Sequence, residues 1–172
     1  MNYEILKHIK NSKIIVIKIG SNLLVNKNQS LNKNWLLSIA KDLKKLVDNK
    51  NKVIIVSSGA IALGKKILDK KILKNLHDKQ AAASIGQIQL SQSWQTALSK
   101  VKLKSSQILL TAEDLENRRK YLNARNTIFA LLDLGVIPII NENDTTSTEE
   151  IRFGDNDKLS AIIANAMSAD ML

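Results

Sequence analysis

The sequence predicts an α/β fold in which a mostly parallel sheet carries helices on both faces, as a three-layer αβα sandwich. Three observations support this prediction. Four short runs are rich in Ile and Val, helical patterns lie between them, and the apolar residues in each run are near-continuous rather than alternating. Continuous apolar runs are typical of strands covered on both faces, and strands that alternate with helices form parallel sheets through right-handed crossovers.

The four predicted strands are "KIIVIKI" (13–19), "KVIIVS" (52–57), "SQILLT" (106–111) and "VIPII" (136–140). The last of them contains Pro138, which has no backbone N–H to donate to a neighbouring strand. We therefore expect this strand to be short or to lose one hydrogen bond.

Helical patterns fill the remaining intervals, with helices expected over about 60–68, 79–99 and 120–134. Two further segments place apolar residues at helical spacing. These residues are Trp35, Leu36, Ile39, Ala40, Leu43, Leu46 and Val47 in the first segment, and Leu159, Ile162, Ile163, Ala166 and Met167 in the second. No linker or repeat divides the 172 residues, so a single domain is expected.

Composition excludes several kinds of site. The chain has no cysteine, which excludes thiol nucleophiles, iron–sulfur clusters and thiolate zinc sites. Only His8 and His77 supply imidazole, and each lies in a lysine-containing segment, so a histidine-based catalytic triad is not expected. No apolar run is long enough for a membrane span, and a soluble cytoplasmic protein is the expectation.

The net charge raises a nucleic-acid hypothesis. The chain carries 26 basic and 16 acidic side chains, for a net charge of +10. The lysines recur through predicted helices, as in "KDLKKL", where solvated helix faces explain them. Two Trp, two Tyr and two Phe leave few aromatic rings for stacking on bases. A basic nucleic-acid-binding domain therefore stays an alternative and is not the favoured interpretation.

Each predicted strand is followed by small or polar residues: "GSN" (20–22), "SSGA" (57–60), "TAED" (111–114) and "NENDTT" (141–146). In open parallel sheets ligands bind at this edge, so the four turns are expected to face one crevice. The last turn and the residues after it are acidic, although the chain is basic. Its acids are Glu142, Asp144, Glu149, Glu150, Asp155 and Asp157. We interpret this acidic segment as one wall of a binding site.

The first strand suggests an anion site. Lys18 lies two residues before Gly20, and a lysine in a buried strand is costly unless its ammonium group emerges at the strand end to meet an anion. Gly20 allows close approach of the backbone to a ligand, and N–H groups at Gly20 and Ser21 are suited to phosphate oxygens. The alternative is a lysine that merely extends its ammonium group into solvent.

The second strand leads into "SSGAIALG", where exposed N–H groups and the helix dipole attract a carboxylate or phosphate. Ser58 is alternatively a simple N-cap. In "GDNDKLSAIIA" one cap does not explain Asn156 and Asp157 together with Asp144, although solvated loop polarity is an alternative. A site that holds an amine there, and a carboxylate at Ser58, would recognise a zwitterionic amino acid.

The reaction that suits these residues is phosphoryl transfer to a carboxylate. A side-chain carboxylate with a pKa of about 4.3 is already ionised at neutral pH, so the reaction needs no general base. Positioning and charge neutralisation then carry the catalysis. The sequence contains neither a "GxxxxGK[ST]" loop nor the protein-kinase motifs, so a nucleotide would have to bind in another way.

At these residues the chain resembles the amino acid kinase superfamily and, within it, the glutamate 5-kinase family. The matching segments occur in family order over nearly the whole chain. They are "VIKIGSNLL", "VIIVSSGAIALG", "KQAAASIGQ", "QILLTAEDL", "YLNARNTIFALLDLGVIPIINENDT" and "FGDNDKLSAIIA". "KIGS" and "SSGA" are shared widely in the superfamily, whereas the last two segments are far more specific.

The resemblance implies an amino acid kinase-like fold, ATP with Mg²⁺, L-glutamate as acceptor and L-glutamyl 5-phosphate as product, the first step of proline synthesis. Residue by residue, it implies that Lys18 is catalytic and contacts the ATP phosphates. Gly20 and Ser21 match the turn around the phosphates, and the substrate-binding positions match Ser58, Gly59, Asp144, Asn156 and Asp157. The metal ligands stay open. L-proline is implied as a feedback inhibitor at an overlapping site.

Relative to that family the chain is C-terminally incomplete. Members continue past "SADML" with a strand, a "TD" turn, a glycine-rich loop and a second lysine that make most of the nucleotide site. Residues 1–172 are therefore expected to be the substrate-binding N-terminal portion of the kinase domain, not active alone, and to form a homo-oligomer or join a completing C-terminal chain. The alternative is an inactive or split-chain glutamate- or proline-binding module.

Overall fold

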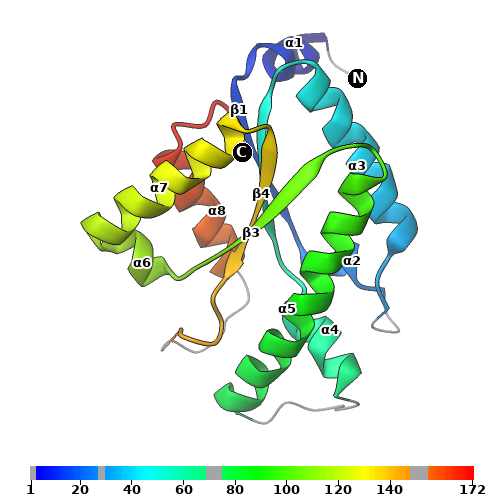
Figure 1. The fold of residues 1–172 in the computed structure, drawn as a ribbon, viewed down its shortest axis with the longest axis vertical. Coiled ribbons are helices and arrows are strands. Elements are labelled where there is room, and N and C mark those ends of the chain that lie inside the picture. The colour runs from blue at the N-terminus through cyan, green and yellow to red at the C-terminus, as the bar shows by residue number, and fades with distance from the viewer. Residues whose placement is uncertain (1–2, 27–29, 69–74, 148–154) are drawn as a thin grey trace.

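The four strands form one parallel sheet in a computed structural model that describes residues 3–26, 30–68, 75–147 and 155–172 (Figure 1). β1 spans Ile14–Ile19, β2 Lys52–Ser57, β3 Lys104–Leu110 and β4 Val136–Glu142. Their order across the sheet is β1-β2-β4-β3, and each neighbouring pair is parallel. The predicted parallel α/β fold is confirmed.

The strand that contains Pro138 is longer than predicted. β4 has seven residues and pairs with β3 over its whole length, including Ser106 opposite Pro138. Its pairing with β2 is limited to Ile139 and Ile140, directly after the proline. Of the two expected outcomes, a short strand is not observed, because β4 pairs with β3 over all seven residues. The limited pairing with β2 agrees with the missing N–H of proline.

Helices cover both faces of the sheet (Figure 1). α3 (Lys33–Asp48), α4 (Ala60–Ile67) and α5 (Leu76–Ser99) lie on one side, and α7 (Arg118–Asp133) and α8 (Asp155–Ala166) lie on the other. These are the five predicted helices. The prediction missed three helices, α1 (Tyr3–Asn11), α2 (Ser21–Leu24) and α6 (Ala112–Glu116). α2 and α6 are too short to show a clear apolar period, whereas α1 is amphipathic and was overlooked.

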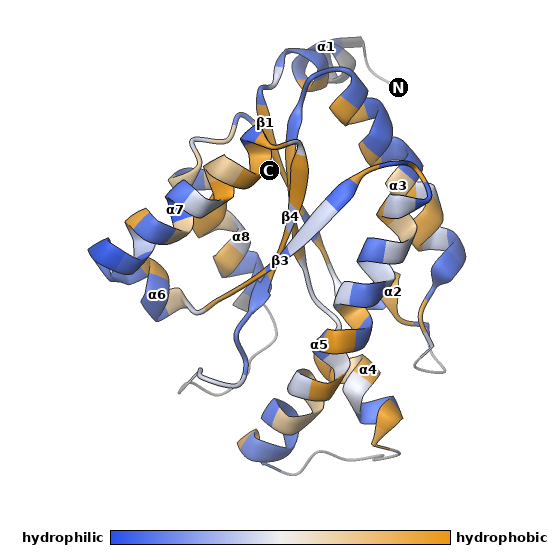
Figure 2. Cartoon of the chain, in the orientation of Figure 1, coloured by the Kyte–Doolittle hydropathy of each residue, from blue (hydrophilic) through white to orange (hydrophobic). Residues whose placement is uncertain are grey.

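Two apolar cores lie on the two faces of the sheet. Val53 and Ile55 of β2 belong to the core beneath α3 and α5, while Ile54 and Val56 belong to the core beneath α7 and α8. Successive residues of a strand point to opposite faces, so a strand buried on both faces needs an unbroken apolar run. Figure 2 shows a largely apolar β4 and a β3 that is hydrophilic over much of its length, between helices with mixed surfaces. Within the described residues no helix could cross a membrane.

Two glycines allow the backbones of α4 and α5 to touch. A Cβ atom at Gly64 would lie 1.7 Å from the carbonyl oxygen of Ala82, and one at Gly86 would lie 1.8 Å from that of Ala60. Real side chains do not approach backbone oxygens so closely, so neither position accepts a larger residue without a shift of a whole helix. This contact sets where α5 runs relative to the turn between β2 and α4.

We expect Gly86→Ala to lower the free energy of unfolding by about 3 kcal/mol, the upper part of the usual range for overpacking, despite the better helix propensity of alanine. Urea denaturation monitored by circular dichroism measures this loss. The exposed residue Gln89 lies on the same helix, and Gln89→Ala should change stability by less than about 0.5 kcal/mol. Equal stability of the two variants would contradict the close contact.

Candidate functional site

The turns after the four strands gather at one edge of the sheet, because parallel strands all end on the same side. Two backbone hydrogen bonds extend the ladder into these turns. Ser58 N donates to Ile19 O at 3.0 Å, and Asn143 N donates to Leu110 O at 2.9 Å. The first residues after β2 and β4 are therefore held in place by the sheet itself.

Lys18 is the fifth of the six residues of β1, and its ammonium group pairs with a carboxylate. Its side chain is 30% exposed, and its ammonium group lies 2.5 Å from Oδ1 of Asp157, near the start of α8. A Cβ atom at Gly20 would lie 3.8 Å from Lys18 Nζ, so the ammonium group lies close to the Gly20 backbone. The arrangement places a cation where β1 gives way to α2, which begins at Ser21.

Ser58 and Asn156 are brought together although 98 positions separate them in the chain. Asn156 Nδ2 donates to Ser58 Oγ at 2.9 Å and to Asn141 Oδ1 at 3.0 Å. The N-cap of α4 is Gly59, with φ +118°, so the alternative of Ser58 as a simple N-cap is wrong. Its hydroxyl group instead accepts a hydrogen bond from α8, and Gly59 takes the left-handed conformation that other residues rarely adopt.

Asp144 lies in a neighbouring pocket of about 280 Å³, between the turn after β4 and α5. Gln87, Gln107, Glu142 and Asn143 also line this pocket. Gln87 accepts a hydrogen bond from Asn141 Nδ2 at 2.7 Å, so one glutamine borders both the pocket of Asp144 and the cluster around Asn156. Of the other predicted acids, Glu149 and Glu150 lie outside the described residues.

The third turn is stabilised by its own side chains. Thr111 Oγ1 accepts from Asp114 N at 3.1 Å, and Asp114 Oδ2 accepts from Thr111 N at 2.9 Å, which forms a capping box at the start of α6. Lys120 Nζ lies 2.8 Å from Asp114 Oδ1. The hydrogen bond from Lys120, followed by that from the Thr111 backbone, lowers the pKa of Asp114 below its usual value.

Sequence reasoning did not single out Asn141 or Gln87, although both lie in segments that resemble the family. Their hydrogen bond joins residues 54 positions apart, on β4 and α5. The sequence also gave no sign that Trp94 would hold a strand end in place. Its Nε1 donates to Ser57 Oγ at 2.9 Å and holds α5 against the end of β2, directly before Ser58. Only the general expectation that strand ends converge could have pointed to Asn141.

Comparisons with known proteins match nearly the whole chain to one protein family. The profile of the Amino acid kinase family matches residues 13–172. A glutamate 5-kinase 1 from Mesorhizobium japonicum is 50% identical over 169 residues, which are 97% of this chain and 44% of that protein. A glutamate 5-kinase from Agrobacterium fabrum is 53% identical over 160 residues, 92% of this chain and 41% of that protein. The chain thus spans less than half the length of these relatives.

A solved structure shares the fold at low sequence identity. The carbamate kinase from Giardia matches 93% of this chain and 73% of its own, with a TM-score of 0.63 and 13% identical residues. At that level of identity the likeness concerns the fold alone, and it confirms the predicted amino acid kinase-like architecture.

The lowered pKa of Asp114 predicts a dependence of stability on pH. Because the folded pKa lies below the usual 3.8, the stabilisation is complete above 3.8 and is lost as pH falls through the folded pKa. Urea denaturation should therefore show wild type more stable than Asp114→Asn at about pH 6, with a smaller difference at about pH 2.5. Lys120→Met removes the largest cause and should weaken this pH dependence. A difference that does not change with pH would contradict the assignment.

Proposed function

The chain belongs to the amino acid kinase family, and we propose that it is the substrate-binding N-terminal portion of a glutamate 5-kinase. The proposed reaction transfers the γ-phosphoryl group of ATP to the side-chain carboxylate of L-glutamate, the first step of proline synthesis. The observation that carries the proposal is about 50% identity to curated glutamate 5-kinases over nearly the whole chain. The alternative of a nucleic-acid-binding domain is not favoured by these relatives.

The proposed reaction requires the protein mainly to position the two reactants and to neutralise the charge on the transferred phosphoryl group. The glutamate carboxylate is ionised at neutral pH, so one of its oxygens attacks the γ-phosphorus directly, and ADP leaves with the electrons of the broken P–O bond. Lys18 then neutralises charge that develops on the transferring group. Asp157, 2.5 Å from the ammonium group, keeps Lys18 at the strand end until phosphate oxygens compete for it.

The residues proposed to recognise the amino acid lie in the turns after β2 and β4 and at the start of α8. Ser58 offers its hydroxyl group directly before the start of α4, where the helix dipole favours a carboxylate. Its backbone N–H is already used in the bond to Ile19 O. Asn156 Oδ1 is buried and has no hydrogen-bond partner within the described residues. An acceptor atom of this kind suits the ammonium group of an amino acid, and Asp144 supplies negative charge nearby.

The phosphate end of ATP fits the residues around Lys18, Gly20 and Ser21. Within the described ranges no three His, Asp or Glu side chains gather as a metal site. Mg²⁺ that accompanies ATP keeps water and phosphate oxygens as ligands and needs only one or two carboxylates. We therefore assign Mg²⁺ to the nucleotide complex and leave its protein ligands open; Asp157, which pairs with Lys18, is a carboxylate beside the proposed phosphate site. Cytoplasmic location, homo-oligomerisation or a completing chain, and feedback inhibition by L-proline belong to the same proposal.

The first test of this function concerns Lys18. In the full-length enzyme, Lys18→Met should lower kcat by about 10²-fold or more and leave glutamate affinity nearly unchanged, because the lost interaction is made mainly in the transition state. Trapping glutamyl phosphate with hydroxylamine measures the rate. If Lys18→Met retains wild-type kcat, Lys18 is not the catalytic cation.

A second test concerns Asp144. Asp144→Asn should weaken L-glutamate binding by about 1.5 to 3 kcal/mol, the range for a hydrogen bond to a charged group, and should spare ATP affinity. Titration calorimetry with each ligand measures both. Asp133, a surface acid at the end of α7, provides the matched control, and Asp133→Asn should leave both affinities unchanged. Equal losses for glutamate and ATP would mean damage to the fold.

A further inference from the structure

A chain of hydrogen bonds runs from the candidate site along α5 to β3. Asn156 Nδ2 donates to Asn141 Oδ1 at 3.0 Å, and Asn141 Nδ2 donates to Gln87 Oε1 at 2.7 Å. Gln87 Nε2 donates to Ser91 Oγ at 3.2 Å, and the Ser91 hydroxyl group donates to Gln107 Oε1. We call these five residues the amide relay.

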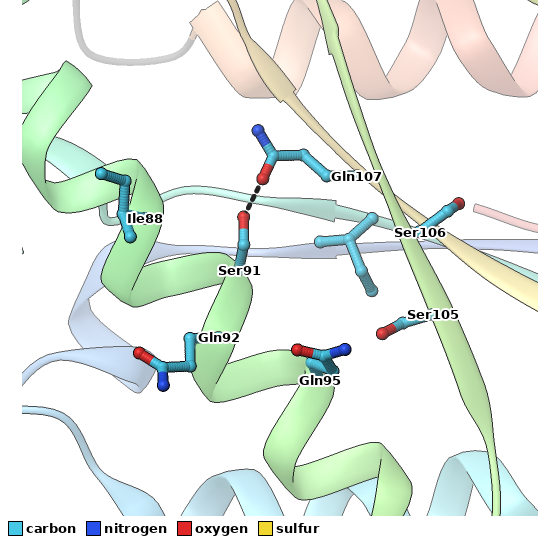
Figure 3. Close-up of a pocket in the computed structure, with 8 residues that line it drawn as sticks. Ile88, Ser91, Gln92, Gln95, Ser105, Ser106 and Gln107 are labelled. Atoms are coloured by element: carbon cyan, nitrogen blue, oxygen red, sulfur yellow. Dashed lines mark hydrogen bonds between the residues drawn. The ribbon is translucent and has the colours of Figure 1, made fainter.

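The four hydrogen bonds of the amide relay all run in the same direction, from Asn156 toward Gln107. The last bond, between Ser91 and Gln107, is drawn in Figure 3, at the mouth of a pocket of about 410 Å³ between α5 and β3. An amide group has one donor end and one acceptor end, so a reversal at one position would set donor against donor at the next. Only one set of amide orientations therefore satisfies every bond of the relay, and each amide holds the orientation of its neighbour.

The orientation matters at the site end. Because Asn156 uses its Nδ2 to donate to both Ser58 and Asn141, its Oδ1 is the atom left over, and this oxygen is buried without a partner in the described part of the chain. Ser58 Oγ accepts from Asn156, so its own hydrogen is available to donate to a ligand carboxylate. A reversed Asn156 would instead present N–H groups where an ammonium group must bind.

We propose that Gln87 is a positioning residue for recognition of the substrate amine. It acts through Asn141, whose orientation it holds by accepting from Nδ2, and thereby keeps Asn156 Oδ1 turned toward the ligand. Gln87 is half-buried on α5 and takes no part in the chemical step. The inference rests on the proposed function, because it takes the ligand to be an α-amino acid.

The test compares two substitutions at this position in the full-length enzyme. Gln87→Leu removes the acceptor, so Asn141 and Asn156 lose their preferred orientation. The Kd and the KM for L-glutamate should then rise about tenfold, the effect of one weakened hydrogen bond to a charged group, with kcat within about twofold. Gln87→Glu keeps an oxygen that accepts from Asn141, and its Kd should stay within about threefold of wild type.

Two controls separate positioning from damage. Gln95 lies two turns further along α5 and lines the pocket of Figure 3, outside the relay, so Gln95→Leu should leave the Kd for L-glutamate unchanged. Glutarate has both carboxylates of glutamate and no amine. Calorimetric Kd values for glutarate should therefore be the same for wild type and Gln87→Leu, since the amine that Asn156 recognises is missing.

The outcomes distinguish this inference from the proposed function. If the wild-type enzyme does not bind L-glutamate, the proposed function fails and the inference falls with it. If wild type binds L-glutamate but Gln87→Leu binds it equally well, or loses glutarate to the same extent, the positioning role is wrong while the proposed function stands. Loss of glutamate affinity in Gln87→Glu equal to that in Gln87→Leu would also overturn the role.

Discussion

The close contact between α4 and α5 determines how the rest of the site is arranged. Gly64 and Gly86 remove the side chains that would otherwise hold the two helices apart, so their backbones meet directly. α5 is thereby fixed along the sheet, and it carries both Trp94, which bonds to Ser57 at the end of β2, and Gln87, which bonds to Asn141 at the end of β4. A shift of α5 would disturb both strand ends at once.

The site divides by charge into two halves that share the edge of the sheet. At β1, the cation of Lys18 is paired with Asp157, an arrangement in which an incoming anion can replace the carboxylate. At β2 and β4, neutral amides and a hydroxyl group surround an oxygen that lacks a partner among the described residues. In the proposed function, the first half would hold phosphate and the second half an amino acid.

Uncharged amides serve the amino-acid half better than more carboxylates would. Buried carboxylates close together repel each other and shift their pKa values, so their charge would change when the ligand leaves. An oriented amide presents the same acceptor oxygen without that cost, provided that its neighbours prevent reversal. The amide relay supplies those neighbours from β4 and α5, while Asp144 in the adjoining pocket adds negative charge at a half-buried position.

The sequence by itself determined the parallel sheet, five of the helices and the edge where the site lies, because these follow from local patterns. An unbroken apolar run, as in β2, identifies a strand buried on both faces, whereas β3 at the edge of the sheet begins with polar residues and stays partly exposed. Parallel strands end on the same side of the sheet. Two of the residues expected at that edge, Lys18 and Asn156, contact Asp157 and Ser58 respectively. The short helix α6 was not predicted, since five residues are too few to show a helical period.

Only the tertiary structure decided which of those residues touch. Ser58 meets Asn156 across 98 positions and Gln87 meets Asn141 across 54, and both contacts depend on the strand order β1-β2-β4-β3 and on the placement of α5. The order places β4 directly beside β2, so Asn141 lies next to the turn of Ser58. Strand order is set by how the helices pack across the whole sheet, so the local propensity of each segment carries no information about it. The direction of the amide relay is likewise a property of the assembled fold, since each amide takes its orientation from a neighbour far away in the sequence.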